Sequence, residues 1–132
     1  MNNVALSISS NVPCGDDAIN HAATWLSTLL CQFRISSTYN TQSRTTTYHN
    51  AVAVGTCPHT AAQLDQLFKA YELSHGRDDK ARQEHVTPID IDIDIVVFNG
   101  TVLREWDFSQ QFFKIGWTQL TGGAKQPNQT KE

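Results

Sequence analysis

Isoleucine and aspartate alternate over residues 89–95, and three more apolar residues follow at 96–98. Alternation with a period of two predicts a β-strand with one buried face, and isoleucine is among the residues that strands favour. The isoleucines therefore face a core, and Asp90, Asp92 and Asp94 share the opposite face of the strand.

The shared acidic face has two interpretations. Aspartates at alternate positions lie about 6.6 Å apart along a strand, and at that distance two unit charges repel by about 0.6 kcal/mol in water or about 2.5 kcal/mol at an effective dielectric constant of 20. A fully solvated face tolerates this repulsion, and the aspartates are then only the wet side of a sheet. A face that lines a cleft needs a cation, and Mg²⁺ with phosphate oxygens is the natural partner.

The rest of the chain supplies further strands and two amphipathic helices. The predicted strands cover residues 4–9, 34–39, 48–56, 89–98 and 101–103. One predicted helix covers residues 17–31, and the other is capped by Thr60 and ends near residues 74–76. This β-α-β-β-α-β order is typical of a ferredoxin-like α+β fold, in which two helices cover one face of an antiparallel sheet. We expect the aspartates to point to the face without helices.

The remaining segments are predicted to be loops, a short C-terminal extension and a tail. Residues 40–47 are polar without an apolar anchor, so we expect a mobile loop that faces a substrate. Residues 77–88 are charged, and the aromatic residues of 106–117 form the extension. We expect a single domain over residues 1–120 and a disordered polar tail over residues 121–132.

Composition limits the partners and the compartment. A net charge of −3 and a pI near 5.9 offer no basic surface for nucleic acid. The N-terminal residues resemble neither a signal peptide nor a membrane span. The three cysteines are widely spaced, without a CxxC pair, which is typical of reduced thiols. We therefore expect a cytoplasmic protein without a membrane or nucleic-acid partner, and its oligomeric state stays open.

Five segments carry a resemblance when they are taken together. They are Val-Ala-Leu-Ser-Ile-Ser-Ser-Asn-Val at 4–12, Tyr-Asn-Thr at 39–41, Tyr-His-Asn-Ala-Val at 48–52, Tyr-Glu-Leu-Ser-His-Gly-Arg at 71–77 and Asp-Ile-Asp-Ile-Val-Val-Phe at 92–98. In this order and spacing they resemble the 6-hydroxymethyl-7,8-dihydropterin pyrophosphokinase family of folate biosynthesis. The resemblance implies transfer of the pyrophosphoryl group of ATP to the hydroxymethyl oxygen of the pterin, which leaves AMP.

The resemblance also implies roles for individual residues. Asp92 and Asp94 would hold two Mg²⁺ ions on the triphosphate of ATP, the co-substrate, and with Arg77 they are the candidate catalytic residues. The candidate nucleotide contacts are Glu72, Arg77, Lys80 and Arg82, and the candidate pterin contacts are Thr41, Tyr48, Asn50, Phe112 and Phe113.

The pterin contacts have the chemistry that such a ligand needs. The amide of Asn50 has both donors and an acceptor for the edge of a pterin, and Tyr48 with either phenylalanine can stack on its ring. We expect Asn50 and Tyr48 near the aspartates, because the strand at 48–56 should neighbour the aspartate strand.

Departures from the family leave the function open. The family has an arginine and a tryptophan in the loop before the aspartate strand, where this chain has Val-Thr-Pro-Ile at 86–89. Residues 107–112 also lack the histidine and the arginine that the family has after that strand. A non-catalytic paralogue that binds a pterin or a nucleotide is therefore the alternative to an enzyme, and an unrelated ferredoxin-like interaction module is a third possibility.

Overall fold

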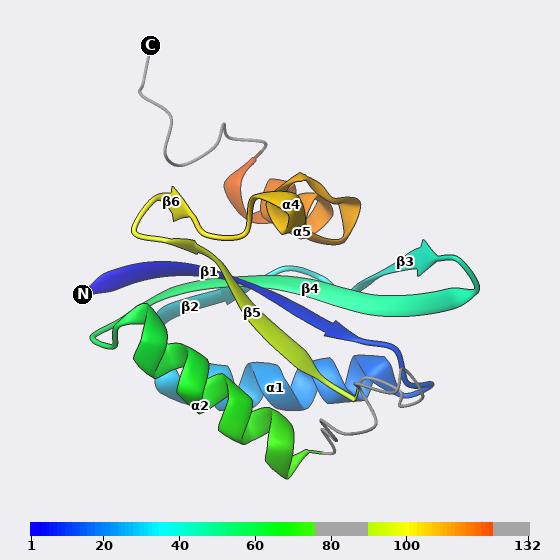
Figure 1. Cartoon of the computed structure of the whole chain (residues 1–132), viewed down its shortest axis with the longest axis horizontal. Coiled ribbons are helices and arrows are strands. Elements are labelled where there is room, and N and C mark those ends of the chain that lie inside the picture. The colour runs from blue at the N-terminus through cyan, green and yellow to red at the C-terminus, as the bar shows by residue number, and fades with distance from the viewer. Residues whose placement is uncertain (76–89, 123–132) are drawn as a thin grey trace.

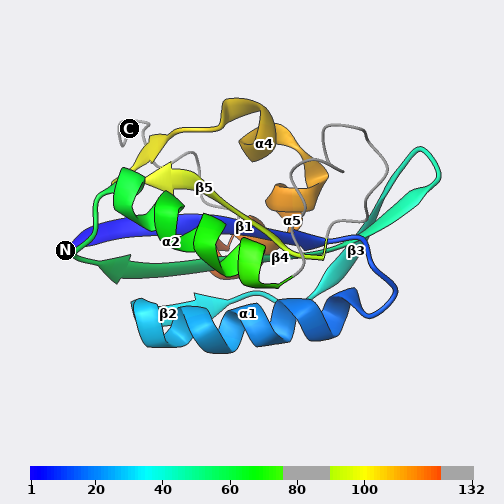
Figure 2. The same cartoon turned by 60° about the horizontal axis from the view of Figure 1, so that its bottom comes forward.

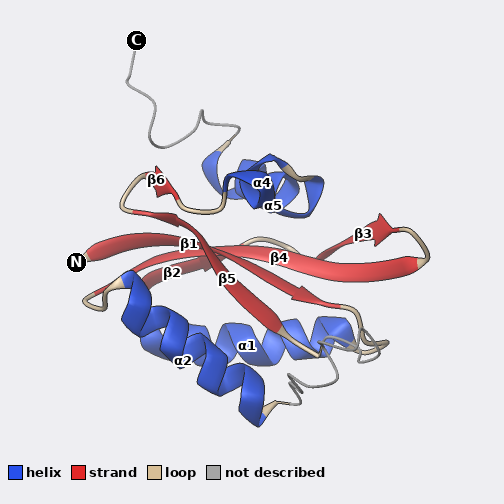
Figure 3. Cartoon of the chain, viewed as in Figure 1, coloured by secondary structure: helices blue, strands red, loops and turns tan. Residues whose placement is uncertain are grey.

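An antiparallel sheet separates two layers of helices in the computed structural model, which describes residues 1–75 and 90–122 (Figures 1 and 3). The six strands are β1 (Asn2–Ser10), β2 (Cys31–Ile35), β3 (Tyr39–Ser43), β4 (Thr46–Cys57), β5 (Asp92–Phe98) and β6 (Thr101–Val102). Helices α1 (Gly15–Leu29) and α2 (Ala61–Ser74) cover one face, and α4 (Glu105–Ser109) and α5 (Gln111–Thr121) lie on the other. The α+β class with an antiparallel sheet is therefore confirmed.

The strand order is β2-β4-β1-β5-β6, and β3 pairs with β4 beyond the end of β2. β1 therefore lies between β4 and β5 and pairs with both along most of its length. The expectation that the strand at 48–56 is a direct neighbour of the aspartate strand is wrong. The first strand occupies that place because its side chains are small or apolar on both faces, which suits the centre of a sheet.

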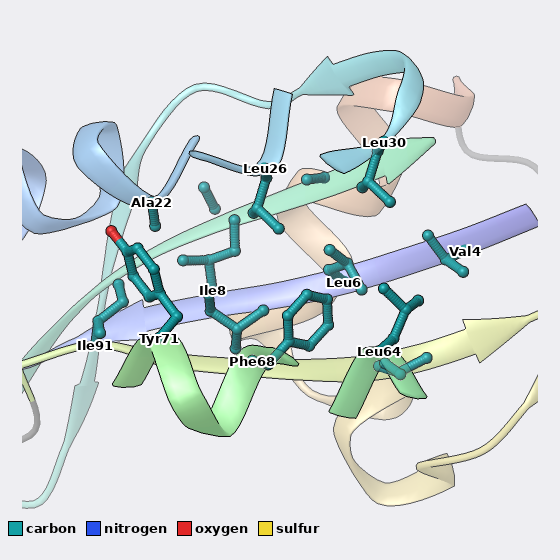
Figure 4. Close-up of a cluster of buried hydrophobic side chains, with 14 of the residues drawn as sticks. Val4, Leu6, Ile8, Ala22, Leu26, Leu30, Leu64, Phe68, Tyr71 and Ile91 are labelled. Carbon is teal, nitrogen blue, oxygen red and sulfur yellow. The ribbon is translucent and has the colours of Figure 1, made fainter. Parts of the chain in front are cut away.

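The face under α1 and α2 carries the larger core (Figure 4). Ile91, Ile93 and Ile95 are buried there, as their alternation predicts. They meet the apolar stripes of the two helices, which run along this face in Figure 2. The two stripes are Ile19, Ala22 and Leu26 on α1, and Leu64, Phe68 and Tyr71 on α2.

Two local sequence signals, a helix cap and a hairpin turn, are confirmed. Thr60 caps α2 and forms a capping box with Gln63, in which each side chain bonds the backbone N–H of the other residue. Asn99 and Gly100 join β5 to β6 with φ angles of 51° and 79°. Both residues adopt the left-handed conformation that a two-residue hairpin turn requires.

The second face of the sheet is covered, so the expectation of a face free of helices is wrong. Phe108 of α4 and Phe113 and Trp117 of α5 are buried against Val52 and Val96 of the sheet. The reason lies in the aromatic region at 106–117, whose large apolar side chains recur at helical spacing and need a surface to cover. Burial of these aromatic rings contributes on the order of 2 kcal/mol each.

The polar segment at 40–47 is also not a loop. Residues 39–43 and 46–50 pair as a hairpin, β3 and the start of β4, with the turn at Arg44 and Thr45. Arg44 has a φ of 56°, which accommodates this tight reversal. The four threonines in this segment favour strand geometry, and a hairpin that extends beyond the sheet needs no apolar face on both sides.

Element ends differ from expectation at a few positions. Helix α1 ends at Leu29, so Cys31 begins β2, and Tyr39 belongs to β3. Helix α5 continues to Thr121, and Gly122 ends it in the left-handed conformation with a φ of 71°. The loop predicted at 77–88 and most of the predicted tail lie outside the described residues. Within residues 1–75 and 90–122, no helix combines the length and the apolar character needed to cross a membrane.

Substitution of Gly116 tests whether α5 packs closely on the sheet. A Cβ at this position would lie 2.6 Å from Cγ2 of Val52 and 2.9 Å from Oγ of Ser36. Gly116→Ala should therefore lower the free energy of unfolding by about 1–3 kcal/mol, although alanine favours helices over glycine by about 1 kcal/mol. Denaturant unfolding measures the change.

The clash also predicts coupling between Gly116 and Val52. In a double-mutant cycle, Val52→Gly should make the Gly116→Ala change markedly less costly, because it removes both Cγ2 and Cβ of Val52, which would lie 2.6 Å and 2.7 Å from the added Cβ. Additive effects of the two substitutions would contradict this packing of α5 on β4.

Candidate functional site

A cavity of about 460 Å³ opens between the sheet and the helices α4 and α5. Asp92 and Asp94 of β5 both line it, next to Ser7 and Ser9 of β1. The isoleucines on the opposite face of β5 are held in the core, so the aspartates can only face this side. Asp90 is partly buried and does not line the cavity.

β1 links the aspartates to the pterin candidates on β4. Ser9 pairs with Asn50 on one side and with Asp92 on the other. Its hydroxyl donates a hydrogen bond to Oδ1 of Asn50 at 3.0 Å. The small serine side chains leave space above the sheet between the amide and the carboxylates, and Asn50 and Tyr48 line the same cavity as the aspartates although their strand is not the neighbour of β5.

Asn50 is 1% exposed and has partners within the chain. Its amide nitrogen lies 2.9 Å from Oγ1 of Thr41 and 3.3 Å from the carbonyl oxygens of Tyr39 and Tyr48. These bonds hold the start of β4 to the hairpin strand β3. A ligand that accepts from the amide nitrogen must replace one of these contacts, whereas Oδ1, which accepts from Ser9, has a second lone pair for a ligand donor.

Asp94 is the electrostatically perturbed group of the site. Its pKa is raised to about 6. Burial is the largest cause, and the neighbouring carboxylate of Asp92 is the next. The guanidinium of Arg104 opposes the shift, while Glu72 and Asp107 add to it. The sum of these influences favours the protonated form of Asp94.

The donor set suits Mg²⁺. Within residues 1–75 and 90–122, no group of three or more His, Cys, Asp or Glu side chains is arranged to hold a metal ion. Mg²⁺ does not need such a cage, because it keeps several waters and is held by one or two carboxylates together with substrate phosphates. Two carboxylates on one strand face that line a cavity, one of them with a raised pKa, fit this ion.

Glu72 contacts β5 from the helix α2. It is 1% exposed, and one carboxylate oxygen accepts a hydrogen bond from the backbone N–H of Ile93 at 2.8 Å. Ile93 lies between the two aspartates, so Glu72 supports the strand segment that presents them. It does not line the cavity, and its contact with a nucleotide stays a prediction.

Of the two candidate phenylalanines, the structure brings only Phe112 to the cavity. Phe113 is 0% exposed and packs on Phe108 and Trp117, with ring centroids 5.5 Å and 5.6 Å apart. In a helix, consecutive residues point about 100° apart, so only one of the two can face the ligand. Phe113 belongs to the core.

Several residues at the cavity were missed in the sequence, among them Arg104 and Trp106. Arg104 lines it and donates from Nε to Oδ2 of Asp107 at 2.6 Å, which raises the pKa of the arginine. Trp106 lines it as well, is 68% exposed, and lies 6.0 Å from the ring of Phe112. The Asn-Gly turn was the available signal, because it pairs Val97 with Val102 and directs the following residues back along β5.

The remaining predicted residues divide into two groups. Thr41 and Tyr48 line the cavity from β3 and β4. Arg77, Lys80 and Arg82 lie outside the described residues, and their contacts with a nucleotide stay predictions.

The fold and the cavity define an α+β protein with a candidate site for a metal ion and a polar aromatic ligand. A family model for 7,8-dihydro-6-hydroxymethylpterin-pyrophosphokinase (HPPK) matches residues 5–121. The chain belongs to this family. A search of curated proteins finds no match.

The perturbed carboxylate predicts a pH-dependent stability. The pKa of Asp94 is about 6 in the folded chain and 3.8 when unperturbed, so the folded state binds the proton more tightly. The free energy of unfolding should therefore fall as the pH rises from about 4 to about 6. Because one pKa unit corresponds to about 1.4 kcal/mol, Asp94→Asn should stabilise the protein by up to about 3 kcal/mol at pH 7 and by almost nothing below pH 3.5.

Asp90→Asn is the matched control, because Asp90 continues the same alternation outside the cavity. Thermal unfolding at several pH values measures both variants. Millimolar Mg²⁺ should raise the melting temperature of the parent and of Asp90→Asn, but not that of Asp94→Asn. Equal stabilisation of Asp94→Asn by Mg²⁺ would contradict the metal assignment.

Proposed function

We propose that the protein transfers the pyrophosphoryl group of ATP to the hydroxymethyl oxygen of 6-hydroxymethyl-7,8-dihydropterin. The observation that carries the proposal is the family match over residues 5–121, together with one cavity that is lined by Asp92, Asp94, Asn50 and Arg104. In the reaction, the hydroxymethyl oxygen bonds to the β-phosphorus, the bond from that phosphorus to the oxygen of AMP breaks, and the hydroxyl proton leaves.

Asp92 and Asp94 would hold two Mg²⁺ ions. Bound there, Mg²⁺ would neutralise negative charge that develops during transfer. The raised pKa of Asp94 supports this role, because a cation that replaces the proton restores the charged carboxylate. Ser7 and Ser9 lie on β1, between the strands of the carboxylates and of Asn50, and their small side chains leave space there.

The pterin would bind against β3, β4 and α5. Tyr48 and Phe112 offer aromatic faces, and Asn50 and Thr41 offer donors and acceptors. Trp106 adds a third aromatic side chain beside Phe112, and its exposure leaves it free to cover a bound ring. A flat ring with a polar edge fits this combination of walls.

Arg104 would serve the phosphate groups. It is the one arginine that lines the cavity among the described residues. Asp107 holds the guanidinium from one side, so the remaining N–H groups can bind phosphate oxygens in a fixed orientation. The loop residues Arg77, Lys80 and Arg82 would add contacts when ATP is bound.

Detection of AMP tests the proposed function. The parent protein, incubated with Mg²⁺, ATP and 6-hydroxymethyl-7,8-dihydropterin, should release AMP in proportion to the pterin diphosphate formed. Omission of Mg²⁺ or of the pterin should abolish this release. Tight binding of both substrates without AMP would instead establish the alternative function, a non-catalytic binding paralogue.

Arg104 should act mainly on the rate. Arg104→Ala should lower kcat by about 10²–10³-fold, since an arginine that stabilises transferring phosphoryl groups contributes at least this much. Its effect on the Kd of ATP should be much smaller, because the contact strengthens in the transition state. Steady-state kinetics and calorimetry separate the two quantities.

Arg34→Ala is the matched control for Arg104→Ala. Arg34 bonds the carbonyl of Leu120 far from the aspartates, so kcat should stay within a factor of two of the parent.

Arg77→Ala is expected to lower kcat more than it weakens ATP binding. An unchanged kcat for Arg104→Ala would shift the phosphate role to the loop residues Arg77, Lys80 and Arg82.

A further inference from the structure

Tyr39 joins β3 to the helix α5 through its hydroxyl group. The hydroxyl donates a hydrogen bond to the carbonyl oxygen of Phe112 at 2.6 Å. It accepts one from the backbone N–H of Gly116 at 3.0 Å. Phe112 and Gly116 are four residues apart. Their carbonyl and N–H groups are therefore a pair that an α-helix ordinarily joins by a hydrogen bond. A side chain from the sheet therefore bonds both ends of the first turn of α5.

The backbone of Tyr39 contacts the other side of the cavity. Tyr39 pairs with Asn50 across the hairpin, and its carbonyl oxygen lies 3.3 Å from the amide nitrogen of Asn50. One residue therefore contacts both Asn50 and Phe112, the residues that would read the edge and the face of a flat ligand.

Other contacts also hold the first turn of α5, because Phe113 is buried against Phe108 and Trp117 and the backbone N–H groups of Phe113 and Lys114 donate to the carbonyl oxygen of Gln110. Gln110, its N-cap residue, forms no side-chain capping hydrogen bond. One turn further on, Gly116 lies so close to Val52 that the helix cannot move toward the sheet. To these contacts the hydroxyl of Tyr39 adds two hydrogen bonds from the sheet to the backbone of the turn that carries Phe112.

The phenol is suited to a permanent bond. It is half-buried, and burial raises its pKa to about 12, so the hydroxyl stays protonated and can donate at neutral pH. An aromatic side chain has only two rotatable bonds, so it transmits position with little flexibility.

We propose that Tyr39 is a positioning residue that sets the distance between Asn50 and Phe112 and so fits the cavity to a bicyclic ring. The identity of that ring as a pterin rests on the proposed function. Tyr39 itself acts through Phe112 and Asn50, and it need not touch the ligand.

Tyr39→Phe removes the hydroxyl and keeps the ring. Calorimetry should show pterin binding that is about 10-fold weaker than in the parent, a loss typical of one hydrogen bond that orders a binding group. Binding of a non-hydrolysable ATP analogue with Mg²⁺ should stay within twofold, because Asp92, Asp94 and Arg104 are unaffected. Tyr71→Phe is the matched control: it removes a hydroxyl from the other face of the sheet, where Figure 4 shows the ring in the core, and should change neither affinity.

The position of Phe112 can be measured without any ligand. Nuclear Overhauser contacts between Phe112 and Trp106, whose ring centroids lie 6.0 Å apart, should weaken in Tyr39→Phe and persist in Tyr71→Phe. In the parent protein, saturation with pterin should slow hydrogen exchange of the Gly116 amide by about 10-fold or more, since the ligand holds the turn closed. This second measurement applies even if Tyr39→Phe does not fold.

The outcomes separate this proposal from the proposed function. Pterin affinity and ring contacts that are unchanged in Tyr39→Phe overturn the role of Tyr39 and leave the function intact. Unchanged exchange of the Gly116 amide on pterin binding does the same. A parent that binds no pterin overturns the proposed function, and the contacts between Phe112 and Trp106 then decide alone whether Tyr39 positions Phe112. Equal weakening of pterin and nucleotide binding indicates general damage and overturns a specific positioning role.

Discussion

Burial of the isoleucines on β5 determines where the aspartates point. Ile91, Ile93 and Ile95 fill the core under α1 and α2, so a shift of one residue in register would place carboxylates in that core. An unpaired carboxylate in such a place costs several kcal/mol. The register is therefore firmly set, and with it the presentation of Asp92 and Asp94 to the opposite face.

The second helical layer turns this acidic face into a site. Without α4 and α5 the aspartates would lie on an open, wet surface, where their mutual repulsion is small. The aromatic side chains of α5 bury the neighbouring part of the sheet, and Gly116 allows the helix to approach β4 closely. The cavity is the part of this interface that large side chains leave unfilled, and burial there is the main cause of the raised pKa of Asp94.

The apolar periodicity and the turn residues predicted those features that depend on residues close together in the sequence. The alternation in β5, the cap at Thr60 and the Asn-Gly turn are all local, and each is confirmed. What depended on packing between distant segments was missed. The helix α5 has an apolar stripe, but which face of the sheet it covers follows from the whole topology.

The candidate site divides in the same way. The aspartates follow from one strand, and Asn50 and Tyr48 from their resemblance to a motif. To choose between Phe112 and Phe113, one must know how α5 is rotated about its axis on the sheet. To place Arg104 at the cavity, one must follow the chain beyond the last residue pair of the β5–β6 hairpin. The order of β4, β1 and β5 could not be read from chain order either, since an antiparallel sheet permits several.

The charges around Arg104 bear on the phosphate role that we propose for it. Asp92, Asp94 and Asp107 all act electrostatically on the guanidinium of Arg104, and Asp107 accepts a hydrogen bond from its Nε. The arginine is thereby held in place but cannot neutralise the aspartate pair as well. Carboxylates alone repel a polyphosphate, whereas under the proposed function bound Mg²⁺ would make the same carboxylates part of a surface that attracts it. Under the proposed function, Mg²⁺ on these carboxylates would therefore supply positive charge beside that of Arg104.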